Sequence, residues 1–147
     1  MGIKIRNIKE TDLNRLAILY EKAFGAPTDL NEMRKQFAKI KSNPDNHFIV
    51  ASDTSKNDLC VGFTHLIIHH DFFDKPKPFA TAWSVMVDEQ YRGMDIGTLL
   101  IQHCEKIAKE KDCMFLQLTT QQSRQAMIKV CEKQGWRKGI SFTKDYD

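Results

Sequence analysis

Hydrophobic side chains along this chain of 147 residues recur with two periods, which separate strand-like from helix-like stretches. Apolar and polar residues alternate over residues 3–8, a period of two that is typical of a half-buried strand. Over residues 13–24, and again over residues 30–40, apolar positions recur every three or four residues, which predicts amphipathic helices. The chain is therefore predicted to begin with a strand followed by two helices.

Polar and turn-forming residues mark the ends of these two helices. Thr11 precedes the first helical stretch and is predicted to be its N-cap, and the sequence Gly25-Ala26-Pro27 is predicted to end it. Asp29 and Glu32 have the spacing of a capping box, which places the start of the second helix between them.

The centre of the chain is rich in strand-forming residues, and a long helix follows. Apolar runs at residues 48–51, 59–68 and 79–87 are separated by Asp, Asn, Ser, Lys and Pro, which predicts a meander of three strands. Apolar positions over residues 96–108 keep helical spacing with charged residues between them, as expected for a helix that lies on a sheet.

The last part of the chain predicts shorter elements. Residues 114–118 form a candidate buried strand, and Ser123 is a candidate cap for a helix that includes residues 126–131. Gly135 is expected to end that helix, and a last strand is expected around residues 140–143. The succession of elements predicts an α/β (α+β) domain in which helices flank a central sheet.

Length and composition favour a single domain over residues 1–147. A chain of this length buries enough surface to fold without disulfides or metals. Hydrophobic residues at 41% and charged residues at 28% are ordinary for soluble globular proteins, and no apolar run approaches the length of a membrane span. No signal-peptide core precedes the first charged residues, so a cytoplasmic location without membrane attachment is expected.

Charge and cysteine patterns argue against other classes of protein. The net charge of +3 is spread over interleaved acidic and basic residues, without the concentrated basic face that nucleic-acid binding requires. The four cysteines have no C-x-x-C spacing and fall within predicted strands and helices. This pattern favours reduced thiols over a disulfide framework, and no metal site is expected.

The most informative segment is residues 85–100, which joins an apolar strand to a helix through a short turn with two glycines. A helix start offers unpaired backbone N–H groups and a partial positive charge, so an anion binds well there. The segment lacks the G-x-x-x-x-G-K-[ST] and G-x-G-x-x-G patterns of nucleoside-triphosphate and dinucleotide sites. An Arg-led turn from Arg92 to Gly97 remains as the candidate phosphate site.

The turn Arg92-Gly93-Met94-Asp95-Ile96-Gly97 resembles the acyl-CoA binding motif [QR]-x-x-G-x-[GA] of the GCN5-related N-acetyltransferases (GNAT). Asp95 stands where the family most often has glycine. If the turn needs a positive φ there, aspartate is among the least costly replacements, but its carboxylate would repel a pyrophosphate that it faced. The order of elements from Ile3 to Phe142 also resembles the family's β-α-α-β-β-β-α-β-α-β succession. That resemblance implies a central, mostly antiparallel mixed sheet flanked by helices on both faces.

The resemblance implies a site for acetyl-CoA as co-substrate. Amides of the turn and a threonine hydroxyl would hold the pyrophosphate, and the backbone of the preceding strand would bind the thioester and the pantetheine. The residues so implied are Val85, Met86, Val87, Arg92, Gly93, Met94, Asp95, Ile96, Gly97 and Thr98.

The catalytic side chains common in the family are not matched. Many members carry a tyrosine four residues before the glycine of a final Gly-aromatic pair, as general acid for the CoA sulfur. Cys131 occupies that position ahead of Gly135 and Trp136. A thiol with a pKa of about 8.5 could protonate a thiolate of similar basicity. The alternative is that Cys131 is a small core residue beside Val130.

The acceptor pocket also lacks the usual acid. Relatives often carry one on the fourth strand, where this chain has Trp83 and Ser84, so these two residues are candidate substrate contacts. Period two places Trp83 on one face with Thr81 and Val85, and either a pocket wall or a core position fits the indole.

Histidines offer an alternative proton acceptor. Of the five, only His65 and His69 are predicted to share a strand face, with His70 on the opposite face. An imidazole with a pKa near 6.5 can accept an ammonium proton through water. His69 is the candidate base, and the alternative is a partly exposed packing residue.

Together these features predict the transfer of an acetyl group from acetyl-CoA to a primary amine of a small molecule, by direct attack in a ternary complex. Two alternatives stay open. The missing tyrosine and acid also fit a non-catalytic acyl-CoA sensor or interaction module, and the sequence does not separate a small-molecule enzyme from a peptide or protein N-acetyltransferase. A homodimer is a possible assembly, because an exposed final strand could pair between subunits.

Overall fold

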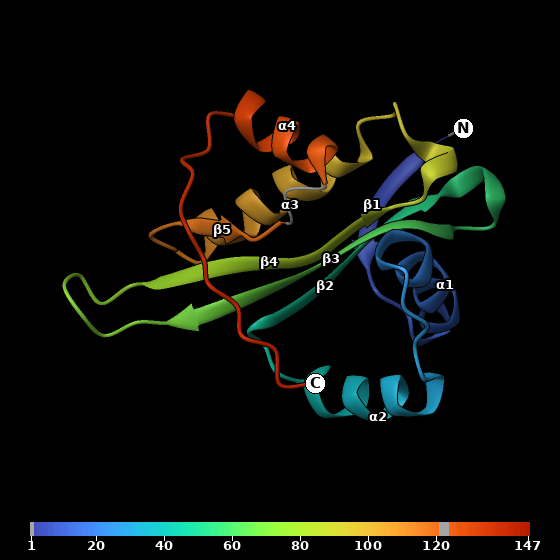
Figure 1. The fold of residues 1–147 in the computed structure, drawn as a ribbon, viewed down its shortest axis with the longest axis horizontal. Helices are drawn as coiled ribbons and strands as arrows, with labels where there is room; N and C mark the ends of the chain where they lie inside the picture. Colours follow the sequence, from blue (N-terminus) through green and yellow to red (C-terminus); the bar gives the residue numbers. More distant parts are fainter. Residues whose placement is uncertain (1, 121–123) are drawn as a thin grey trace.

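A single five-stranded sheet forms the middle layer of the molecule (Figure 1). The computed structural model describes residues 2–120 and 124–147. The strands lie side by side in chain order, as β1 (Ile3–Asn7), β2 (Asn46–Asp53), β3 (Leu59–His70), β4 (Pro78–Val87) and β5 (Leu116–Leu118). Neighbouring strands are antiparallel except β4 and β5, which are parallel. The predicted mostly antiparallel mixed sheet is confirmed.

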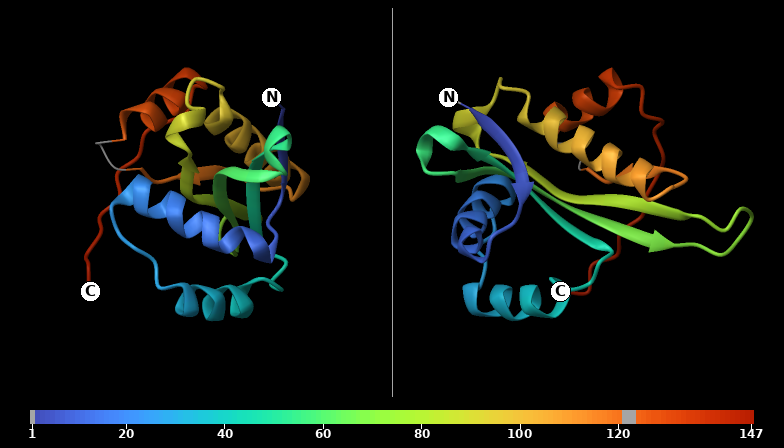
Figure 2. Two further views of the ribbon diagram at one scale, coloured as in Figure 1. Left: turned by 90° about the vertical axis from the view of Figure 1, so that its right-hand side faces the viewer. Right: turned by 180° about the vertical axis from the view of Figure 1, so that it is seen from behind.

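Helices cover both faces of this sheet (Figures 1 and 2). One face carries α1 (Leu13–Phe24) and α2 (Leu30–Ile40), and the other carries α3 (Ile96–Glu110) and α4 (Gln125–Lys133). Within the described residues, no helix has both the length and the apolar character needed to cross a membrane.

The sheet separates two apolar cores. The larger core lies between the sheet and α3, where Leu66 of β3 and Leu100 of α3 are fully buried. The smaller core lies under α1, where Leu16 and Leu19 meet Phe63 of β3. Burial of these apolar faces on both sides stabilises the sheet and fixes which face each strand residue occupies.

The helix boundaries confirm most of the predicted signals. Gly25 ends α1 with a left-handed φ of 75°, and the Asp29 carboxylate accepts two backbone N–H groups in the first turn of α2. The prediction for Thr11 was wrong, because Thr11 lies inside a short 3-10 turn and Asp12 directly precedes α1. The Asp12 carboxylate accepts two hydrogen bonds from the Arg6 guanidinium, at 2.8 and 2.9 Å. This ion pair lies at the start of α1.

The predicted final strand around residues 140–143 was wrong. Residues 134–147 leave α4 without joining the sheet and run past its β5 edge toward α2 (Figures 1 and 2). Ile140 and Phe142 are 86% and 95% exposed, so neither side chain is buried in a core. The predicted cap Ser123 lies outside the described residues, and α4 begins at Gln125.

Candidate functional site

A cleft of about 630 Å³ lies beyond the point where β4 and β5 stop pairing. The two strands pair only over residues 80–82 and 116–118. Past these residues, the cleft is bounded by the end of β4, the following turn, the first turn of α3, and parts of α1 and α4. Most of the predicted CoA contacts line it, namely Val85, Val87, Arg92, Gly93, Asp95, Ile96, Gly97 and Thr98.

Two of the predicted contacts place their side chains elsewhere. Met86 is buried in the smaller core against α1. Met94 packs against the larger core. Neither side chain is among the described residues that line the cleft, so any role in binding belongs to their backbone.

A bulge distorts β4 where the strand enters the cleft. Phe63 of β3 stands opposite Met86, and His65 stands opposite Trp83, so β4 contains one residue more than β3 between these two pairs. Ser84 lies in this interval with a φ of 55°, an uncommon conformation for a residue other than glycine. A bulge interrupts the ladder and bends the strand, so it changes the direction in which the next backbone groups point.

The bulge changes which residues share a face. Val85 is buried in the larger core together with Ala82, whereas Met86 faces α1. The expectation that Val85 lies on one face with Trp83 was wrong, because the extra residue breaks the period of two. A core position for Trp83 was also wrong, since the indole is 52% exposed. Trp83 is therefore accessible next to the bulge, on the face that carries α1 and α2.

The turn after β4 presents backbone N–H groups. Gly93 and Asp95 both have positive φ, 84° and 57°, so Asp95 adopts the conformation that the motif position requires of glycine. The Asp95 side chain makes no capping hydrogen bond at the start of α3. The N–H groups of Ile96, Gly97 and Thr98 belong to its first turn, where helical N–H groups lack intrahelical partners. Because all three residues line the cleft, the helix start is suited to an anion.

Buried polar contacts anchor this turn to the rest of the fold. The Asp88 carboxylate pairs with the Arg15 guanidinium of α1 and accepts the Gln90 backbone N–H at 3.0 Å. The Tyr91 hydroxyl donates to Asp53 Oδ2 of β2 at 2.6 Å, and the pKa of Tyr91 is raised by this bond to a carboxylate. The turn is therefore held by both α1 and the sheet before any ligand binds.

Charged side chains of both signs line the cleft. The basic ones are Arg92, Arg124 and Lys22, and the acidic ones are Asp88, Glu89 and Asp95. The Arg124 guanidinium donates from Nη2 to the Val85 carbonyl oxygen at 2.5 Å and lies over the Phe24 ring, 5.0 Å from its centroid. Burial and the nearby charge of Arg92 lower the pKa of Arg124. An anion bound between the two guanidinium groups would relieve their repulsion.

Sequence reasoning missed Arg124. One signal was available, because the positive pole of a helix disfavours a cation at its N-terminus and Arg124 directly precedes α4. A cation retained there against the helix dipole suggests a role outside the helix.

The predicted acid, Cys131, lies on α4 but does not line the cleft. It is partly buried and packs against the larger core, and α4 contributes Val130 to the cleft instead. Burial raises the pKa of the Cys131 thiol, so the thiol keeps its proton at neutral pH. Cys131 thus lies on α4, outside the lining of the cleft, and its role as acid stays a prediction.

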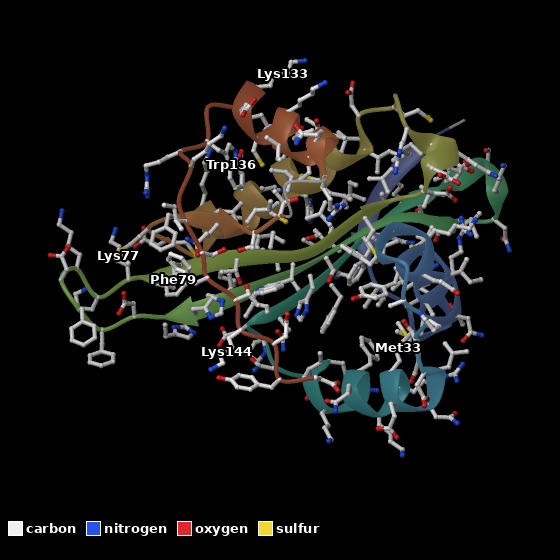
Figure 3. The ribbon with its side chains drawn as sticks, viewed as in Figure 1. Met33, Lys77, Phe79, Lys133, Trp136 and Lys144 are labelled. Atoms are coloured by element: carbon white, nitrogen blue, oxygen red, sulfur yellow. The ribbon has the colours of Figure 1, made fainter. Side chains whose placement is uncertain are left out.

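The predicted base, His69, lies at the other end of β3. Its Nε2 is 2.8 Å from Thr81 Oγ1, and its ring stacks on Phe79 with the centroids 4.8 Å apart. Figure 3 labels Phe79 near the hairpin end of the sheet, away from α1 and the cleft that α1 borders. The role of His69 as base stays a prediction.

A helix start with unpaired backbone N–H groups borders a cleft beside a bulged strand, an arrangement that suits a phosphate-bearing ligand. Comparison with known proteins identifies the family. The Acetyltransferase (GNAT) family matches residues 13–136, and the chain belongs to this family.

Individual relatives are more distant. A Drosophila melanogaster protein named probable glucosamine 6-phosphate N-acetyltransferase is 26% identical over 136 residues, which cover 91% of this chain. The chain spans 60% of the length of that relative.

Two solved structures share the fold across their whole length. A transcriptional regulator from Bacillus halodurans C-125 superposes with a TM-score of 0.87 at 24% identity, covering 99% of this chain and 100% of the other. A glucosamine-6-phosphate N-acetyltransferase from Arabidopsis thaliana superposes with a TM-score of 0.85 at 18% identity, covering 100% of both chains. At these identities the likeness establishes the fold.

Proposed function

We propose that this chain transfers the acetyl group of acetyl-CoA to a primary amine of a small molecule. The observation that carries the proposal is the juxtaposition, in one cleft, of the uncapped start of α3 and the bulged end of β4. The first feature suits a pyrophosphate and the second suits a thioester, so the cleft fits the two ends of an acyl-CoA.

The charge of the cleft supports the same ligand. A pyrophosphate on the amides of Ile96, Gly97 and Thr98 would lie at the positive pole of α3. Arg92 and Arg124 add positive charge along the same cleft. The carboxylate of Asp88 is neutralised by Arg15, which leaves less negative charge to oppose the ligand.

The chemistry needs a neutral amine and a polarised thioester. Attack of the amine nitrogen on the carbonyl carbon forms the C–N bond and places negative charge on the thioester oxygen, which backbone N–H groups of β4 beside the bulge can stabilise. The C–S bond then breaks, and the CoA thiolate takes up a proton. Cys131 is the predicted proton donor and His69 the predicted acceptor, each acting directly or through water.

The relatives suggest which amine to test first. The Drosophila relative and the Arabidopsis structure are both named for acetylation of glucosamine 6-phosphate. We propose an amino-sugar phosphate as the first acceptor to test. Exposed Trp83 and Ser84 are the proposed acceptor contacts, because they lie next to the bulge and so beside the expected position of the thioester.

Two measurements test the proposal. Calorimetry with acetyl-CoA measures binding, and release of free CoA measures turnover with glucosamine 6-phosphate, an aminoglycoside, spermidine and a lysine-containing peptide. We expect binding together with turnover of a small amine. Binding without turnover of any of these amines would favour the acyl-CoA sensor, and turnover of the peptide alone would favour a peptide N-acetyltransferase. Absence of binding at millimolar acetyl-CoA would overturn the proposal.

A further inference from the structure

A partly buried series of hydrogen bonds leads from α2 to an imidazole beside the bulge. The Asn46 side-chain amide donates from Nδ2 to the Ile40 carbonyl oxygen at 3.1 Å, and Asn46 Oδ1 lies 2.9 Å from His65 Nε2. The His65 ring stacks on Phe48, with the centroids 4.6 Å apart, and Phe48 in turn contacts the Phe37 ring of α2. The imidazole is therefore held in place by stacking on one face of the ring and by the hydrogen bond at Nε2.

This series of hydrogen bonds determines the tautomer of His65. A backbone carbonyl only accepts hydrogen bonds, so the Asn46 group that faces Ile40 is the NH₂ group and the group that faces His65 is the oxygen. Asn46 Oδ1 also only accepts, so His65 Nε2 carries the ring proton. The lone pair then lies on Nδ1, and within the described residues Nδ1 has no hydrogen-bond partner and is not a buried atom.

His65 occupies the rung of the sheet that adjoins the bulge. It stands directly opposite Trp83, and the next residues of β4 are Ser84 and the cleft residue Val85. Paired residues on adjacent antiparallel strands point to the same face, and Val85 follows Trp83 by at most roughly 7 Å along the strand. The imidazole and the exposed indole therefore share the face of the sheet that carries α1 and α2, next to the bulge, and neither side chain is among the described residues that line the cleft.

His69 is a weaker candidate on the same criteria. It lies four residues further along β3, roughly 13 Å from His65 at the usual strand rise. Its Nε2 contacts the Thr81 hydroxyl, which can donate or accept, so this contact does not fix the tautomer.

We propose that His65 is the general base of the acetyl transfer and that Asn46 is its positioning residue; this inference rests on the proposed function. The Nδ1 lone pair accepts a proton from the substrate ammonium, and the neutral amine attacks the thioester carbon. The C–N bond forms, the C–S bond breaks, and the second nitrogen proton passes, directly or through water, to the departing thiolate. The His65 imidazolium then releases its proton to water, so one proton is released overall for each ammonium acetylated.

The electrostatic setting determines the pH dependence. Burial, and to a lesser extent the charge of His47 on β2, lower the pKa of His65 below 6.5. The base is therefore unprotonated at neutral pH. The value of kcat/KM falls only when the pH drops through this lowered pKa, which places the acidic limb of the profile below pH 6.5.

Substitution of His65 by glutamine tests the role directly. With the amine that the native protein turns over best, we expect His65→Gln to lower kcat about 100-fold and to remove the acidic limb, with acetyl-CoA binding unchanged. The matched control is His70→Gln on the same strand, where an exposed imidazole pairs with Asp45, and we expect native rates. A His65→Gln variant with native kcat and an unchanged limb overturns the proposal. Loss of acetyl-CoA binding together with activity assigns His65 a structural role and also overturns it.

A second variant covers the case in which His65→Gln does not fold. Asn46→Asp keeps an acceptor for Nε2–H and adds a negative charge that stabilises the imidazolium, so the acidic limb is expected to move up by about one pH unit. An unmoved limb overturns the proposal. If the native protein turns over no amine, the proposed function itself is wrong, independently of His65. Nitrogen NMR of His65 still tests the geometry, because protonated Nδ1 in the neutral ring would overturn it.

Discussion

At the scale of single residues, Asp95 has two opposing effects on ligand binding, one through its backbone and one through its charge. Its φ of 57° satisfies the backbone turn that usually takes glycine, yet its carboxylate belongs to a residue that lines the proposed anion site. A like charge near a pyrophosphate weakens binding, and the effect decreases with salt. The same residue therefore permits the turn and opposes the ligand.

Removing this charge is predicted to tighten binding of acetyl-CoA. We expect Asp95→Gly and Asp95→Asn to lower the dissociation constant about fivefold at low salt, equivalent to about 1 kcal/mol, as measured by calorimetry. Asparagine also tolerates positive φ, so it separates the charge from the backbone. A gain with glycine alone would assign the effect to the backbone, and unchanged affinity in both variants would contradict the prediction.

Arg124 is predicted to contribute to binding through its charge and its bond to the backbone of Val85. We expect Arg124→Ala to weaken acetyl-CoA binding about tenfold, because hydrogen bonds to charged groups contribute about 1.5–3 kcal/mol. Lys133→Ala removes the same charge from the far end of α4 and is the control (Figure 3). Calorimetry measures the affinity for acetyl-CoA. An equal loss of affinity in both variants would show that only the net charge of the protein matters.

At the scale of elements, the close approach of α3 to β3 holds the helix start at the cleft. A Cβ atom on Gly62 would lie 2.9 Å from Ile96 Cγ2 and 3.3 Å from both Ala51 Cβ and Leu100 Cδ1. Ile96 is the first residue of α3 and one of the residues that line the cleft. The absence of a side chain at position 62 therefore allows the start of α3, and the turn before it, to lie close to the sheet.

Overpacking at this contact is predicted to destabilise the fold. We expect Gly62→Ala to lower the free energy of unfolding by about 1–3 kcal/mol, measured by urea denaturation, and to weaken acetyl-CoA binding as α3 moves outward. Gly139→Ala is the control, because no heavy atom lies within 4 Å of its Cβ position. Native stability of Gly62→Ala would show that α3 accommodates the methyl group without strain.

The secondary-structure elements also show which features the local sequence pattern can predict. Amphipathic periodicity located α1, α2, α3 and α4 to within a few residues, and most residues of the turn from Arg92 to Gly97 line the cleft, where the anion site stays a prediction. The bulge at Ser84 had no such signal, because neither Ser84 nor its neighbours is a glycine or a proline. It arises from how β4 pairs with β3, and this pairing is set by both cores and not by the sequence of β4.

At the scale of the whole molecule, apolar side chains remain exposed after α4. Ile140, Phe142 and Tyr146 are 86%, 95% and 92% exposed, and residues 134–147 form no strand. In the sheet order, β5 occupies an edge, and within the described residues it pairs only with β4. An apolar extended segment and an unpaired strand edge are complementary, so two copies can complete each other.

A dimer through this segment is the predicted assembly. We expect light scattering after gel filtration to give twice the chain mass, and removal of residues 139–147 to give a monomer. Replacing Ile140 and Phe142 by serine tests the apolar contribution without shortening the chain. A native monomer, or a dimer that survives truncation, would contradict the prediction.

The amino-acid sequence by itself determined the single α/β domain, the boundaries of its helices and the Arg-led turn, because periodicity, capping and turn chemistry act between residues close in the chain. Only the tertiary structure decided that Trp83 is exposed, that Arg124 reaches Val85, and that Asn46 orients His65. The Asn46–His65 and Arg124–Val85 contacts join residues 19 and 39 positions apart. Their geometry depends on how strands register and helices dock, which no local pattern specifies.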